Sequence, residues 1–134
     1  MGIEGSEHEE TAPDAPALVV SKLAISLAGK TKKIKILSGS LVHQVYGQDE
    51  VTEKFVCNYG LNPKFRDIIE KRPLTIVGVD LDGEVRAVEI SDHPFYVGTL
   101  YQPQLSSAPD SLHPLIVAYL RAVVAFRKSG NRRL

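Results

Sequence analysis

Cys57 is the residue whose chemical type most directly suggests covalent catalysis. It is the only cysteine in the sequence, and a cysteine becomes a strong nucleophile when a histidine, a cation or a helix N-terminus favours its thiolate. Lys54 is close in the sequence, and folding could bring His93 next to the thiol. We therefore name Cys57 and His93 as candidate catalytic residues of a hydrolytic or redox site. The alternative is that Cys57 is a small buried hydrophobic residue.

The four histidines do not form a recognisable metal-binding pattern. They are His8, His43, His93 and His113, and no two have the short spacing of zinc ligands. His93 and His113 each precede a proline, which favours an extended backbone. A single cysteine excludes an internal disulfide and a multi-cysteine metal site. The sequence therefore predicts no metal and no cofactor.

The segment Ala24–Thr31 matches a relaxed phosphate-loop pattern, and Leu74–Asp80 could serve as its metal-binding strand. A phosphate loop must lead into a helix whose N-terminal amides face the phosphates. Here Lys32–Leu37 follows with strand periodicity, and Ile25 and Leu27 would crowd the phosphate oxygens. Nucleotide binding is therefore the least favoured of the functions we consider.

Charge and hydropathy exclude several classes of partner. The chain has 134 residues, a formal net charge of zero and 43% hydrophobic residues, which suits one globular domain. Neither nucleic acid nor a membrane is an expected partner. The N-terminus has no signal-peptide pattern, which favours a cytoplasmic location. Residues 1–16 are acidic and carry no Lys or Arg, so we expect a disordered leader there and a domain over residues 17–134.

The rest of the sequence predicts a mixed α/β domain. The segments Leu74–Val79 and Val85–Ile90 flank a turn, so they predict a hairpin. Ser40 is a candidate helix N-cap, with the helix running through Val45, and Ser111 or His113 could cap a final helix that starts at Pro114. We expect further strands at Ala17–Leu27, Lys33–Leu37, Val51–Cys57 and Phe95–Tyr101, and a helix that begins at Asn62-Pro63.

The segment His93–Gln104 resembles the C-terminal signature of class I glutamine amidotransferase domains. In that signature a strand ends in Phe-His-Pro-Glu, whose histidine and glutamate complete a Cys-His-Glu triad. The CTP synthase version is the most similar, in order over about residues 33–126. The run Cys57–Pro63 and the Tyr-Gln-Pro-Gln end also resemble stand-alone proteins related to the CTP synthase C-terminal region. The resemblance implies part of a flavodoxin-like domain with an antiparallel β portion and a C-terminal helix. It also covers Ser40–Gly47, Val51, Glu53, Asn62, Gly78–Gly83, Glu89 and His113–Leu115.

The departures from this family concern the catalytic residues. Gln102 stands where the resemblance places the catalytic histidine, and Gln104 where it places the orienting glutamate. A glutamine amide does not titrate, so it cannot take a proton from a thiol. The Gly-x-Cys-x-Gly elbow that carries the family's nucleophile is absent from this sequence. Cys57 falls instead in a stretch that resembles an Arg-His-rich motif, where Val56 and Asn58 replace arginines.

The leading prediction is therefore a glutamine amidotransferase-like domain, or a fragment of one, that does not hydrolyse glutamine by itself. One alternative is a thiol-dependent enzyme or redox protein that uses Cys57. Another is the glutaminase part of a CTP synthase, in pyrimidine nucleotide biosynthesis, that a separate chain completes. A partial parallel sheet would leave an unpaired edge, which predicts a homo-oligomer or a partner chain that completes the sheet.

Overall fold

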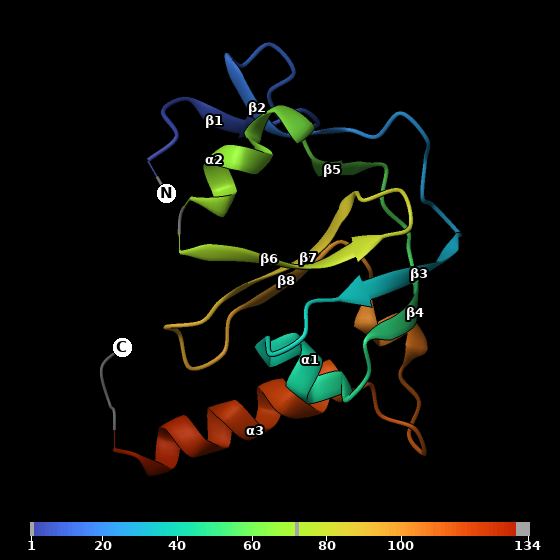
Figure 1. Cartoon of the computed structure of the whole chain (residues 1–134), viewed down its shortest axis with the longest axis vertical. Coiled ribbons are helices and arrows are strands. Elements are labelled where there is room, and N and C mark those ends of the chain that lie inside the picture. Colours follow the sequence, from blue (N-terminus) through green and yellow to red (C-terminus); the bar gives the residue numbers. More distant parts are fainter. Residues whose placement is uncertain (1, 72, 131–134) are drawn as a thin grey trace.

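Two sheets of different size organise the computed structural model, which describes residues 2–71 and 73–130 (Figure 1). The larger sheet has the strand order β4-β3-β6-β7-β8, and the smaller has the order β1-β2-β5. The larger sheet is antiparallel at every strand pair. The strands are β1 Ser6–His8, β2 Ala17–Lys22, β3 Thr31–Ile36, β4 Glu50–Lys54, β5 Tyr59–Leu61, β6 Leu74–Asp80, β7 Val85–Ile90 and β8 Val97–Thr99.

The centre of the larger sheet follows from the alternation in its sequence. In β3 the buried Ile34 and Ile36 alternate with more exposed lysines, as a half-buried strand requires. The strands β6 and β7 form the expected hairpin. Within β6, a Cβ atom at Gly78 would lie 2.8 Å from the Ala87 Cβ atom, so the close packing of β6 on β7 depends on glycine at this position.

The two main helices lie together along one side of the larger sheet (Figure 1). The first, α1 (Leu41–Tyr46), begins at the N-cap Ser40 and ends at Gly47, which has a φ of 66°. The second, α3 (Pro114–Lys128), begins at His113, whose side chain accepts a hydrogen bond from the Leu115 N–H. Of the two caps considered for α3, the structure thus selects His113. The short helices are the 3-10 turns η1 Pro63–Phe65 and η2 Pro103–Ser106, and α2 Arg66–Glu70.

Several sequence-based boundaries were wrong. The expected disordered leader contains β1, which pairs in parallel with β2, and Glu9 accepts a hydrogen bond from the Lys22 N–H. The pairing of β1 with β2 leaves no signature in local composition. The expected strand at residues 51–57 ends at Lys54, and the one at residues 95–101 shortens to β8. The expected strand at residues 17–27 ends at Lys22. In the described residues the parallel pairing is limited to β1 and β2, so the anticipated partial parallel sheet is replaced by an antiparallel one.

Candidate functional site

Cys57 and Gln102 lie in direct contact where the chain leaves β4. The Gln102 Nε2 group donates to Cys57 Sγ at 3.0 Å, and Sγ donates to the Leu100 carbonyl oxygen at 3.1 Å. Both hydrogen-bonding functions of the half-buried thiol are therefore occupied. The structure places the candidate cysteine beside the glutamine that the resemblance aligns with a catalytic histidine.

Backbone contacts with β4 hold Gln102 in this position. Its N–H donates to the Lys54 carbonyl oxygen at 3.1 Å, and its Oε1 atom accepts from the Val56 N–H at 3.0 Å. The Gln102 amide therefore continues the hydrogen bonding of the β4 edge beyond the last residue of the strand. Gln104, in the following turn η2, is exposed, and it lies outside this contact. The pair Gln102 and Cys57 thus forms a polar site that contains no titratable base.

A buried polar cluster joins β4, α1 and the start of α3. The Glu53 Oε1 atom accepts a hydrogen bond from the Tyr46 hydroxyl at 2.6 Å and another from His113 Nε2 at 2.8 Å. The His113 Nδ1 atom accepts from the Leu115 N–H, so the ring proton sits on Nε2. The Tyr101 hydroxyl lies 3.2 Å from that of Tyr46.

Burial dominates the chemistry of this cluster. Desolvation by burial raises the pKa of Tyr46, and the neighbouring Tyr101 and Glu53 raise it further. Burial likewise raises the pKa of Tyr101. Both hydroxyls therefore stay protonated at neutral pH and act as hydrogen-bond groups. The Glu53 Oε2 atom is buried and has no hydrogen-bond partner among the described residues.

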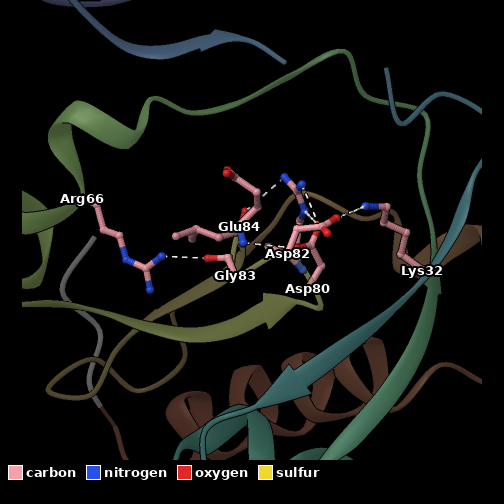
Figure 2. Close-up of polar contacts among 8 residues, drawn as sticks. Lys32, Arg66, Asp80, Asp82, Gly83 and Glu84 are labelled. Carbon is pink, nitrogen blue, oxygen red and sulfur yellow. Dashed lines mark hydrogen bonds and ion pairs between the residues drawn. The ribbon is translucent and has the colours of Figure 1, made fainter. Parts of the chain in front are cut away.

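A second polar cluster fixes the turn between β6 and β7 (Figure 2). Asp80 accepts a hydrogen bond from Arg86 Nε at 2.9 Å, and Arg86 Nη2 forms an ion pair with the same carboxylate oxygen at 2.8 Å. Figure 2 shows Lys32 and Arg66 approaching the turn from opposite sides, and Lys32 Nζ lies 3.3 Å from Asp80. Desolvation by burial raises the pKa of Asp80, but the hydrogen bond and charge of Arg86 outweigh it and hold the pKa below its ordinary value.

The other sequence-predicted candidates do not join the Cys57 site. His93 lies in the exposed turn before β8, where its Nδ1 atom accepts from the Phe95 N–H. Cys57 contacts residues that follow β8, so His93 and Cys57 are at opposite ends of this strand. The segment after Lys30 is the strand β3, and this geometry does not suit a phosphate loop. Within residues 2–71 and 73–130 there is no cluster of His, Cys, Asp or Glu arranged for a metal.

Sequence reasoning missed Glu53 as a central polar residue, although a signal was present. Val51 and Glu53 in β4 and Phe55 just after it alternate and are all buried, so Glu53 occupies an inward-facing position. A carboxylate on the inward face of a strand requires buried partners. Tyr46 and His113 supply them from segments far apart in the sequence.

With this geometry established, comparisons with known proteins identify the fold. The structure superposes on the glutaminase domain of Trypanosoma brucei CTP synthase, solved with bound acivicin, with a TM-score of 0.85 at 19% identity. The match covers 92% of this chain and 52% of that chain. This chain has the fold of one part of a CTP synthase glutaminase domain. The antiparallel β portion and C-terminal helix expected from the class I glutamine amidotransferase resemblance are thus confirmed.

The sequence comparison agrees with the structural one. The chain is 34% identical over 133 aligned residues to CTP synthase from Methanothermobacter thermautotrophicus and 29% identical over 131 to that from Sulfurisphaera tokodaii. These alignments cover 92% and 91% of this chain, but only 25% of each CTP synthase. No family model matches the chain. The described helices include none that is long and apolar enough to cross a membrane. The similarity to CTP synthase therefore extends over most of this chain, which spans about a quarter of those enzymes.

Proposed function

We propose that this chain is a CTP synthase glutaminase-like unit that does not hydrolyse glutamine by itself. The contact between Gln102 and Cys57 is the observation that carries the proposal. A glutaminase of this class needs a base that accepts the thiol proton, and the Gln102 side chain offers only an amide. In this proposal Gln102 and Gln104 replace the catalytic histidine and glutamate of the related enzymes.

The position of Gln102 supports a structural role for its side chain. Its side-chain amide forms hydrogen bonds with Val56, Cys57 and Leu100, so it links the segment after β4 to the segment after β8. Hydrogen bonds to three neighbouring residues therefore hold the Gln102 side chain in the site. Removal of the Gln102 side chain would therefore disturb local structure more than catalysis.

Ammonia release from glutamine tests the proposal directly. We expect none from the wild-type chain, and none from the Gln102→His/Gln104→Glu variant, because the elbow that carries the nucleophile is absent from the sequence. Ammonia release by the wild type that is abolished in Cys57→Ser would contradict the proposal. The Cys57→Ser variant is also the control for contaminating glutaminase, since background activity would survive the substitution.

The second candidate function is thiol chemistry at Cys57. The observation that favours it is the side-chain contact between the half-buried Sγ atom and a polar amide, which is unlike the environment of a cysteine packed only among apolar groups. Rapid alkylation by iodoacetamide at pH 7, well above the rate of a free peptide thiol, would support this candidate. Alkylation no faster than that of the peptide thiol would remove it.

A further inference from the structure

The helix α3 is more apolar than its surroundings in this chain explain. From Leu115 to Phe126 its one charged residue is Arg121, so apolar side chains surround the helix on almost every side. A helix of that kind is normally enclosed by other elements. Here Leu115 is its one buried residue within the described structure.

The uncovered side of α3 forms a continuous apolar groove. Leu112, Leu120 and Val124 are 59%, 55% and 52% exposed, respectively. With Val117 and Ala125 they line a hollow of about 490 Å³, at whose margin Arg121 and Lys128 lie. Figure 1 shows α1 and the larger sheet on one side of α3 and no described helix or strand on the other. We call these seven residues the α3 groove.

We propose that the α3 groove is the docking surface for the complementary part of a glutaminase-type domain, and this inference rests on the proposed function. The superposition accounts for 92% of this chain but for 52% of the solved glutaminase domain, so a large part of such a domain has no counterpart here. That remainder of the domain is the proposed occupant of the α3 groove. It presents an apolar face to Leu120 and Val124, and acidic groups to Arg121 and Lys128.

Co-expression tests the docking. The partner is the part of the Methanothermobacter thermautotrophicus glutaminase region that has no counterpart in this chain. The positive control for co-purification is the segment of the same Methanothermobacter enzyme that aligns with this chain. We expect the wild-type chain to co-purify with this partner in a 1:1 complex. The Leu120→Asp/Val124→Asp variant should lose the complex. The control Ile25→Asp/Leu81→Asp, which changes two residues that are 71% and 64% exposed outside α3, should retain it.

Three results would overturn this inference. The partner could co-purify with its own segment but not with this chain. The complex could persist in Leu120→Asp/Val124→Asp. The chain alone could form a discrete dimer that this variant abolishes, which would assign the groove to a second copy. An ammonia assay on the purified complex separates the two proposals, because activity would contradict the role of Gln102 and leave the docking intact.

Discussion

At the scale of single residues, Gln102 donates a hydrogen bond to the Cys57 Sγ atom, while Sγ itself donates to the Leu100 carbonyl oxygen. We predict that Gln102→Ala increases the rate of Cys57 alkylation by iodoacetamide severalfold at pH 7, because it removes the amide that lies against Sγ. Gln104→Ala is the matched control, since Gln104 is exposed in the same segment. Equal rates in the wild type and Gln102→Ala would show that the amide does not limit access to the thiol.

Glu53 is the residue on which the buried cluster depends. Glu53→Ala would leave the Tyr46 hydroxyl and His113 Nε2–H without their acceptor, and unsatisfied buried donors are costly. We predict a loss of about 3 kcal/mol in the free energy of unfolding, measured by urea denaturation. Glu53→Gln should cost less, because its amide oxygen can still accept both hydrogen bonds.

Glu50→Ala provides the control on the same strand. Glu50 is exposed and pairs with Lys33 at the surface, so its loss should change the free energy of unfolding by no more than about 0.5 kcal/mol. Similar losses for Glu53→Ala and Glu50→Ala would contradict the central role of the buried cluster.

The candidate site was only partly predictable from single residues. Cys57 and Gln102 were both selected from the sequence, but for separate reasons. Their contact arises because the segment after β8 returns to the edge of β4, and this tertiary arrangement has no local sequence signal. His93 was paired with Cys57 because folding could have joined them, but the strand β8 separates the two.

At the scale of elements, the β6–β7 hairpin depends on the buried ion pair of Asp80 and Arg86. Arg86 outweighs the effect of burial and holds the folded-state pKa of Asp80 below its ordinary value. A carboxyl group with a lowered folded-state pKa stabilises the fold above the unfolded-state pKa, and this stability is lost as the pH falls through the folded-state value. The free energy of unfolding should therefore decrease as the pH falls from about 5 toward 2.

Asp80→Asn tests this source of acid sensitivity. We predict that it lowers the free energy of unfolding at pH 7 by about 3 kcal/mol, since Arg86 stays buried without its counter-ion. The same variant should flatten the decline at acidic pH. Asp82→Asn is the control, because Asp82 is exposed and its ion pair with Lys32 lies at the surface. An unchanged acid profile in Asp80→Asn would assign the sensitivity to other carboxyl groups.

Elements with a strong local pattern were predictable, and those built from distant contacts were not. The hairpin, the helix capped by Ser40 and the final helix follow from turn, cap and periodicity signals, and the structure confirms them. The strand β1 has an acidic, polar sequence and exists through its pairing with β2. The arrangement of five antiparallel strands likewise depends on which strands meet, which local patterns do not specify.

At the scale of the whole molecule, the α3 groove is an exposed apolar surface in the described structure. The dye ANS fluoresces when it binds such a surface. We predict strong ANS fluorescence with the folded wild-type chain at pH 7, and at least a twofold decrease with Leu120→Asp/Val124→Asp. Circular dichroism verifies that the variants remain folded. Ile25→Asp/Leu81→Asp should leave the fluorescence nearly unchanged, because isolated exposed side chains do not form a continuous binding surface. An equal decrease in ANS fluorescence in both variants would mean that the dye responds to general surface charge. The α3 groove would then not be the main exposed apolar surface.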